Sequence, residues 1–200
     1  NNITYKDIAD MWIHEGFTAY SENLYLDYHF GTKASEAYVV GTRSNIQNDS
    51  PIIGPYGVNK SGSGDMYYKG ANMLHTLRQL VEDDDKWRQI LRGLNKDFYH
   101  KTVTTKEIEG YLSKHTGKDL SAFFNQYLRT TMIPTLEYTL EGEEIKYRYT
   151  EVVEDFDMPV LVFVNGMEKW LFPNSEWKTE KLDGTQVVFD KNFYIETKKI

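Results

Sequence analysis

Histidines are the side chains best suited to hold a metal in this sequence, because the chain contains no cysteine. The five histidines are His14, His29, His75, His100 and His115. No two of them stand four residues apart, the spacing at which two imidazoles on one helix face bind zinc. His14 and Glu15 could begin an H-E-x-x-H motif, but Thr18 occupies the position of the second histidine. The sequence therefore contains no complete zinc motif, and it also lacks disulfides, thiolate metal sites and cysteine nucleophiles.

Motifs for other common chemistries are missing as well. There is no G-x-S-x-G nucleophile turn, no G-x-x-x-x-G-K-[ST] phosphate loop and no G-x-G-x-x-G dinucleotide loop. The acidic run at residues 82–85 lacks the glycine and the twelfth-position glutamate of an EF-hand calcium loop. Acidic residues are favoured in the first turn of a helix by its dipole, so this run predicts a helix start.

Two short strings are more informative together than either is alone. Residues 12–22 have the sequence W-I-H-E-G-F-T-A-Y-S-E, and residues 67–71 have the sequence Y-Y-K-G-A. The first resembles the W-L-x-E-G-F-A-x-Y-x-E segment of the zinc aminopeptidases that include aminopeptidase N and the leukotriene hydrolase. The second resembles the Y-x-K-G motif of the same family. The resemblance is specific over about residues 1–80 and extends weakly to the later helices.

This resemblance implies roles for three side chains. Glu15 resembles the glutamate that completes the zinc site beside the two histidines of H-E-x-x-H, a donor set that leaves one position for water. Glu22 follows seven residues later, two helical turns, and so lies on the same helix face. It resembles the carboxylate that orients a zinc-binding histidine from behind. Tyr67 resembles the catalytic tyrosine whose hydroxyl stabilises the oxyanion of the tetrahedral intermediate.

The family spacing also implies where the missing zinc ligands would lie. In the family, eighteen residues separate the second histidine from the zinc-binding glutamate. With Glu15 in that role, the second histidine falls five residues before Asn1, and the asparagine of the continuing H-x-W-x-G-N sequence falls on Asn1. The chain begins without an initiator methionine or a targeting segment. We therefore expect a C-terminal fragment that starts just after H-E-x-x-H.

The implied function is that of a fragment of a zinc-dependent aminopeptidase of the gluzincin type, which hydrolyses peptides at the amino terminus with the help of the metal. The sequence contains neither the general-base glutamate within H-E-x-x-H nor the family's G-x-M-E-N segment, which binds the substrate amino terminus. We expect the isolated chain to hydrolyse no peptides and to bind zinc without tight affinity. The parent protein would hold zinc, bind a peptide substrate and pack this fragment against the remainder of its catalytic domain.

Two other interpretations stay open. The first is a non-catalytic peptide- or protein-interaction module derived from this family. Intact Glu15, Glu22 and Tyr67 argue against it, because such a module need not keep its catalytic residues. An H-E-x-x-H motif upstream would favour the enzyme, and substituted histidines would favour the module. The second is carbohydrate binding by Trp170 and Trp177, although such rings are more typical of a sandwich core.

The period of the apolar residues predicts helices up to about residue 131, because apolar side chains recur every three or four residues. A first helix would carry Ile8 to Leu26 along one face, and Thr4 with Asp7 has the form of a capping box before it. Asp65 could cap a later helix. A loop rich in glycine and proline is expected at residues 50–64. The remaining predicted helices cover residues 33–48, 66–81, 87–94, 105–115 and 119–128.

After Pro134 the period changes to two, which predicts antiparallel strands. Strands are expected at residues 136–140, 145–149, 160–164 and 170–172, with a hairpin turn at Asn165-Gly166. The predicted fold is α+β. By the resemblance, residues 1–132 would be the helical C-terminal half of a thermolysin-like catalytic domain, and residues 133–200 would form a small antiparallel β-sandwich.

Charge and hydropathy argue against a nucleic-acid partner and against a membrane-spanning helix. The chain has 23 basic and 30 acidic side chains, a net charge of -7. Such a balance argues against a nucleic-acid partner, because it repels phosphate groups. No apolar run approaches the 18 or so residues that a membrane-spanning helix needs. The compartment of the protein stays open, since a chain without cysteine is compatible with any redox environment.

Overall fold

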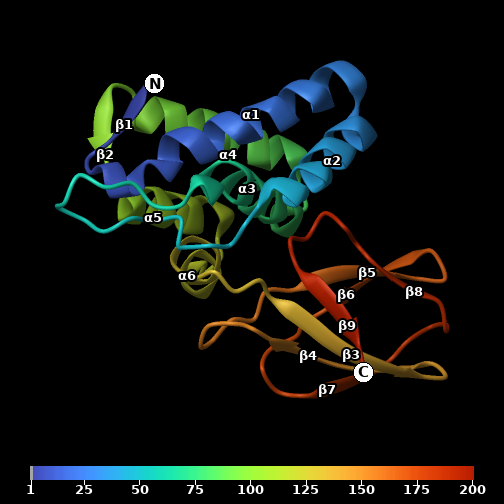
Figure 1. Ribbon diagram of the computed structural model, residues 1–200. Coiled ribbons are helices and arrows are strands. Elements are labelled where there is room, and N and C mark those ends of the chain that lie inside the picture. The colour runs from blue at the N-terminus through green and yellow to red at the C-terminus, as the bar shows by residue number, and fades with distance from the viewer. Residues whose placement is uncertain (1) are drawn as a thin grey trace. The chain divides into compact units, whose positions relative to one another are not determined.

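The computed structural model describes residues 2–200 (Figure 1). The chain divides into two compact units, one ending at Thr131 and the other starting at Met132. The first unit is helical and the second consists of strands, so the fold is α+β. The assignment of residues 1–132 to a peptidase domain and of 133–200 to a β-sandwich domain remains a proposal. Across residues 2–200, no helix combines the length and the apolar character needed to span a membrane.

Within its described residues, 2–131, the helical unit contains six α-helices, three 3-10 helices and one pair of short strands. In chain order they are β1 (Ile3–Tyr5), η1 (Ile8–Asp10), α1 (Trp12–Phe30), α2 (Thr32–Gly41), η2 (Thr42–Asn45), η3 (Gly64–Met66), α3 (Tyr68–Val81), α4 (Asp84–Asp97), β2 (Lys101–Val103), α5 (Thr105–Thr116) and α6 (Ser121–Arg129). Each predicted helix has a counterpart, because each carries its apolar spacing locally, but the helix predicted at residues 33–48 ends as α2 at Gly41 and continues only as η2 to Asn45. The parallel pair of β1 and β2 was not predicted.

The predicted capping box at Thr4 is wrong. Thr4 lies in β1, opposite Thr102 of β2. Asp7 instead caps η1, where its carboxylate accepts the backbone N–H of Ala9 at 2.9 Å. The four-residue pattern could not reveal this, because the competing partner of Thr4 lies almost a hundred residues away.

The predicted cap at Asp65 is also wrong. The hydroxyl of Ser63 caps η3 by accepting the backbone N–H of Asp65. The buried Asp65 carboxylate accepts the backbone N–H groups of Gln47 at 2.9 Å and Asn48 at 2.6 Å. Asp65 therefore holds the loop after α2 rather than the start of α3.

Helices α1 and α3 pack at a point where two glycines face each other. A Cβ atom on Gly16 of α1 would lie 3.1 Å from the backbone oxygen of Met66 and 3.5 Å from the Cα atom of Gly70. A Cβ atom on Gly70 would lie 3.1 Å from the Cα atom of Gly16. Since backbone atoms cannot yield as a flexible side chain does, this approach requires small residues on both helices.

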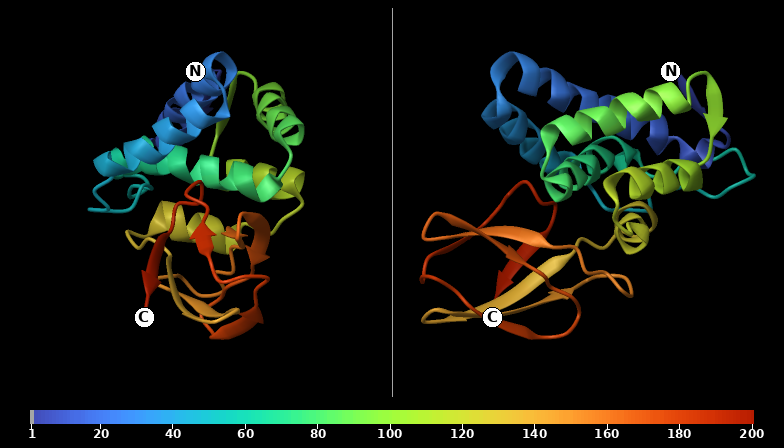
Figure 2. Two further views of the ribbon diagram at one scale, coloured as in Figure 1. Left: turned by 90° about the vertical axis from the view of Figure 1, so that its right-hand side faces the viewer. Right: turned by 180° about the vertical axis from the view of Figure 1, so that it is seen from behind.

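A buried arginine ties α3 to the helices beside it. Arg78 donates to the two carboxylate oxygens of Asp84 on α4, both at 2.7 Å, and to Asp27 on α1 at 2.8 Å. Nearby, the indole N–H of Trp87 on α4 donates to the hydroxyl of the buried Tyr20 at 2.9 Å. These polar contacts fix α1, α3 and α4 around one apolar core. Helix α2 turns back beside the end of α1 after Gly31, whose φ of 84° suits glycine (Figures 1 and 2).

The second unit consists of two sheets, visible as two layers of strands in Figure 2. One sheet has the order β7-β4-β3-β9 and the other β6-β5-β8. Their strands are β3 (Thr135–Glu141), β4 (Glu144–Thr150), β5 (Val160–Val164), β6 (Met167–Leu171), β7 (Lys178–Lys181), β8 (Val187–Phe189) and β9 (Glu196–Lys199). Every second residue of β4 and β5 is buried, as the period predicts. The parallel pairing of β3 with β9 departs from the antiparallel expectation.

The two tryptophans considered for carbohydrate binding occupy different surroundings. Trp170 on β6 packs edge-on against the buried Phe193, with ring centroids 5.7 Å apart. Trp177 is partly exposed, and Lys146 and Arg148 lie 5.1 and 4.6 Å from its ring centroid. Both cations favour the electron-rich face of the ring, so a sugar stacking there would compete with them.

The α1–α3 crossing predicts that Gly16→Leu destabilises the helical unit. The new side chain would overlap backbone atoms of η3 and α3, and overpacking of this kind costs about 1–3 kcal/mol. Gly110→Leu on α5 is the matched control, because a Cβ atom there meets nothing within 4 Å. Leucine favours a helix more than glycine does, by up to about 1 kcal/mol, so the control should be neutral or stabilising. Denaturant unfolding of both variants measures this, and equal stabilities would contradict the tight crossing.

Candidate functional site

Glu15 and Tyr67, which come from the two sequence motifs, lie together in the structure. Glu15 is half-buried in the first turn of α1, and Tyr67 is 40% exposed directly before α3. The pKa of Tyr67 is raised, first by partial burial and then by the negative charge of Glu15 and a side-chain hydrogen bond with it. The phenol therefore lies near the Glu15 carboxylate, and at neutral pH it keeps its proton.

The glycine crossing explains why these two side chains meet. Glu15 directly precedes Gly16, and Tyr67 lies one turn before Gly70. Since Gly16 and Gly70 face each other, the chain positions beside them are brought to the same edge of the α1–α3 contact. Each motif thus combines a polar side chain with a small residue that lets it approach the other.

Glu22 lies two turns beyond Glu15 on the same face of α1 and is exposed. Its carboxylate accepts a hydrogen bond from the hydroxyl of Tyr38 on α2. Among the hydrogen bonds described for residues 2–200, the partner of Glu22 is Tyr38 rather than Glu15 or Tyr67. Sequence reasoning missed Tyr38, because no motif surrounds it. Ser35, Tyr38 and Thr42 are three and four residues apart, which places them on one helix face. This spacing was the signal in the sequence that could have pointed to Tyr38.

His14, to which the sequence assigned no chemical role, ties α1 to β1. Its Nε2 atom lies 2.8 Å from the backbone oxygen of Ile3 and donates to it, since a carbonyl can only accept. Its ring packs against Tyr5, with centroids 4.5 Å apart. This hydrogen bond holds the segment before α1 against the first turn of the helix that carries Glu15.

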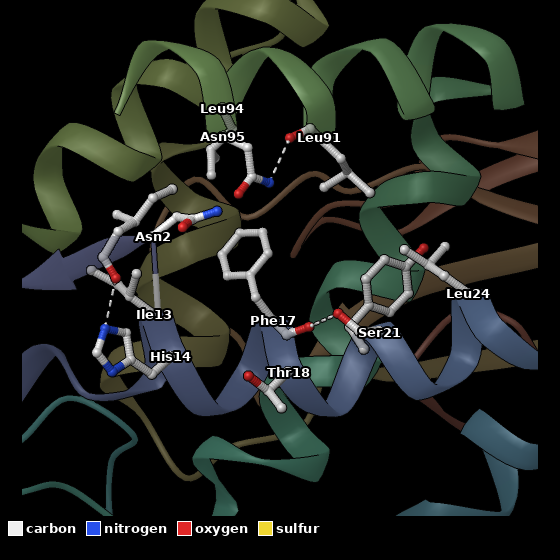
Figure 3. Close-up of a pocket in the computed structure, with 12 residues that line it drawn as sticks. Asn2, Ile13, His14, Phe17, Thr18, Ser21, Leu24, Leu91, Leu94 and Asn95 are labelled. Atoms are coloured by element: carbon white, nitrogen blue, oxygen red, sulfur yellow. Dashed lines mark hydrogen bonds between the residues drawn. The ribbon is translucent and has the colours of Figure 1, made fainter. Parts of the chain in front are cut away.

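A pocket of about 330 Å³ lies between α1 and α4 (Figure 3). The ring of Phe17 points from α1 toward Leu91 and Asn95 of α4 in this view. The pocket is lined by polar and apolar side chains, among them His14, Phe17, Ser21, Leu24 and Asn95. Neither Glu15 nor Tyr67 lines it, so it is separate from the motif pair.

The possible metal-donor side chains do not form a complete zinc site in the part of the chain that the structure describes. Within residues 2–200, no three or more His, Cys, Asp or Glu side chains are grouped so that they could hold a metal. A single carboxylate such as Glu15 can supply one oxygen ligand to zinc, and a complete centre needs further donors. The family asparagine expected at Asn1 lies outside the described residues.

Lys69, the lysine of the Y-x-K-G string, is fully buried at the start of α3. Its Nζ atom donates to the backbone oxygen of Thr130 at 2.9 Å. Burial lowers its pKa from 10.5 to about 8, and the charge of Asp65 opposes that change. Lys69 thus links the start of α3 to the chain that follows α6, which is a structural role.

The lowered pKa of Lys69 predicts a pH-dependent stability. Between about pH 8 and 10.5 the unfolded state binds more protons than the folded state, so stability from this group rises with pH. The full pKa difference corresponds to about 3 kcal/mol. Relative to Lys69→Met, the wild-type chain should gain most of that free energy from pH 7 to pH 10 in urea unfolding. Lys114→Met on the exposed face of α5 is the control. An unchanging difference between wild type and Lys69→Met would contradict the burial of a charged amine.

Comparison with known proteins finds similarity to one family of peptidases. The peptidase family M1 domain matches residues 1–127. No curated protein matches the sequence significantly. Among solved structures, the chain is similar to Legionella pneumophila aminopeptidase A, whose crystal structure is in complex with aspartic acid. The TM-score is 0.72 at 16% identity, over 98% of this chain and 25% of that chain.

At 16% identity this structural similarity shows the fold, and the chain spans a quarter of the length of that aminopeptidase. The family match, in contrast, covers more than half of the chain and includes both motifs. The members of this family are in general zinc-dependent peptidases. The chain belongs to peptidase family M1.

Proposed function

We propose that this chain supplies a zinc ligand, Glu15, and an oxyanion-stabilising phenol, Tyr67, to a zinc-dependent aminopeptidase. The substrate is a peptide whose first bond, next to the free amino terminus, is hydrolysed. The observation that carries this proposal is the proximity of the Tyr67 phenol to the Glu15 carboxylate, whose charge helps to raise the pKa of the phenol. It brings an anionic metal donor and a neutral hydrogen-bond donor from two separate motifs to one place.

Each of these groups has a defined task in such a reaction. Glu15 supplies one anionic oxygen on a rigid helix. Tyr67 directs an O–H bond toward the carbonyl oxygen of the scissile bond as negative charge develops on it. Because its pKa is raised, the phenol stays protonated at neutral pH and can donate. Zinc, when bound, acts as a Lewis acid toward the same carbonyl group.

We propose further that Glu22 supports the centre from behind by orienting one of the two histidine ligands. Its position two turns from Glu15, on the same face of α1, supports this role. Those histidines and the general-base glutamate are not present in this sequence. The 200 residues alone would therefore neither bind zinc tightly nor hydrolyse peptides.

The remainder of the catalytic domain is the partner that we propose for the exposed end of α1. Tyr25, Tyr28 and Phe30 near the end of this helix are 58%, 85% and 67% exposed. The pocket between α1 and α4 lies along the same helix, closer to its start. Aromatic side chains exposed along one helix are typical of a surface that packs against another part of a protein.

Tyr67→Phe tests the proposed reaction in the protein that carries this chain together with the two zinc-binding histidines. Loss of the hydroxyl should lower kcat about 100- to 1,000-fold while KM changes little, because the lost hydrogen bond forms mainly in the transition state. Bound zinc should stay stoichiometric. Tyr99→Phe is the control, since Tyr99 is exposed and stacks on His100, a ring contact that phenylalanine keeps. An unchanged kcat for Tyr67→Phe would instead favour a non-catalytic interaction module.

The chain by itself offers a second test. Titration calorimetry with zinc should show no tight binding, because one carboxylate of the centre is too few. Hydrolysis of a chromogenic amino-acid amide should not exceed the background rate, because no general base is present. Stoichiometric zinc binding at micromolar concentration would refute the proposed division of ligands.

A further inference from the structure

The contact between Tyr38 and Glu22 joins the last residue of the first motif to a residue outside both motifs. Tyr38 is half-buried on α2, and its hydroxyl donates to the Glu22 carboxylate on α1. Glu22 itself is exposed. An exposed glutamate samples several side-chain conformations, and a hydrogen bond from a fixed phenol selects one of them.

The register of α2 against α1 is set next to this contact. The hydroxyl of Ser35 donates to the side-chain oxygen of Asn23 at 2.8 Å, and both residues are buried. Ser35 lies one turn before Tyr38, and Asn23 directly follows Glu22. The buried hydrogen bond therefore places Tyr38 opposite Glu22, because neighbouring turns of a helix share a face.

The other end of α2 is tied to α3 beside Tyr67. The amide nitrogen of the buried Asn72 lies 2.9 Å from the backbone oxygen of Tyr68 and 3.2 Å from that of Val39. It also lies 3.2 Å from the hydroxyl oxygen of Thr42. Asn72 thus joins the α2 turn that follows Tyr38 to the α3 turn that follows Tyr67. Helix α2 is held at both ends, which leaves the Tyr38 ring little freedom to move.

We propose that Tyr38 is a positioning residue, whose hydroxyl holds the Glu22 carboxylate on the face of α1 that carries Glu15. This inference rests on the proposed function, because the orientation of Glu22 matters for zinc only if Glu22 supports a histidine ligand. Tyr38 touches neither substrate nor metal in this role. It acts through Glu22, as a further layer of hydrogen bonding behind the zinc ligands.

The protonation of Tyr38 agrees with this role. The hydrogen bond to Glu22 is the largest cause that raises its pKa to about 12, followed by burial and by the charges of Glu22 and Tyr68. Glu22→Gln should move the pKa of Tyr38 back toward its ordinary value of 10. NMR titration of the 200-residue chain with ¹³Cζ-labelled tyrosine measures this, and Tyr38→Phe identifies the resonance. An unchanged pKa would show that the contact is absent and would overturn the inference.

Three variants test the role in the zinc-loaded protein that carries the two histidines: Tyr38→Phe, Glu22→Gln and their combination. Loss of a partner behind a zinc ligand costs about 10- to 100-fold in metal affinity, and we expect Glu22→Gln to fall in that range. Tyr38→Phe should weaken zinc binding about 3- to 10-fold in competition with a chelator, since the carboxylate itself remains. In the Glu22→Gln background, Tyr38→Phe should add nothing. Tyr99→Phe is the control, and thermal unfolding checks that each variant is folded.

The outcomes separate the inference from the proposed function. If Glu22→Gln weakens zinc binding but Tyr38→Phe does not, the inference fails and the role of Glu22 stands. If the two substitutions act additively, Tyr38 does not act through Glu22 and the inference fails again. If Glu22→Gln leaves zinc affinity unchanged, the proposed role of Glu22 fails, and the inference fails with it.

Discussion

The close approach of Gly16 and Gly70 is the constraint on which the candidate site depends. With the two backbones in contact, Met66, Tyr67 and the start of α3 lie directly against the first turn of α1. One methylene group added at Gly16 or Gly70 would push the two helices apart, because no flexible side chain lies between the backbones to make room for it. The Tyr67 hydroxyl would then move away from the Glu15 carboxylate. The chemistry of the pair is therefore a consequence of helix packing. Loops contribute less, since the two side chains lie at the starts of helices whose directions the core determines.

That packing is itself held by polar groups that an apolar core could not replace. Arg78 neutralises Asp27 and Asp84 from two different helices, and Asn72 joins α2 to α3 through backbone and side-chain oxygens. Such contacts are directional, so they select one register where apolar side chains would accept several. The burial of Lys69, in contrast, costs free energy. Its burial disfavours the charged form, and its hydrogen bond to Thr130 offsets part of that cost. The start of α3 thus contains a buried amine with a lowered pKa, two residues after Tyr67 in the chain.

Local patterns in the sequence were enough to predict most of the fold. Pairings between segments that lie far apart in the chain could not be predicted from such patterns. The six α-helices follow from apolar spacing within each segment, and the buried alternation of β4 and β5 follows from a period of two. The β1–β2 pair could not be predicted, because its strands are short and lie about a hundred residues apart in the chain. The same reason explains the wrong caps at Thr4 and Asp65, whose true partners belong to other segments. For the site, Glu15 and Tyr67 could be named from motif strings. Tyr38 could not, because only the folding of α2 onto α1 places it beside Glu22.

Packing accounts for some residues of the two motifs but not for all of them. Gly16 and Gly70 are required by the helix crossing, and Lys69 satisfies the backbone oxygen of Thr130, so the fold alone explains these three. Glu15 and Tyr67 differ, because one is half-buried and the other is 40% exposed. A hydrogen bond between such groups adds only about 1 kcal/mol to stability, and many other pairs of residues could supply as much. A fold-only explanation therefore leaves unexplained why an anionic oxygen and a protonated phenol meet at this edge. A site that needs one metal donor and one oxyanion donor side by side requires that pair.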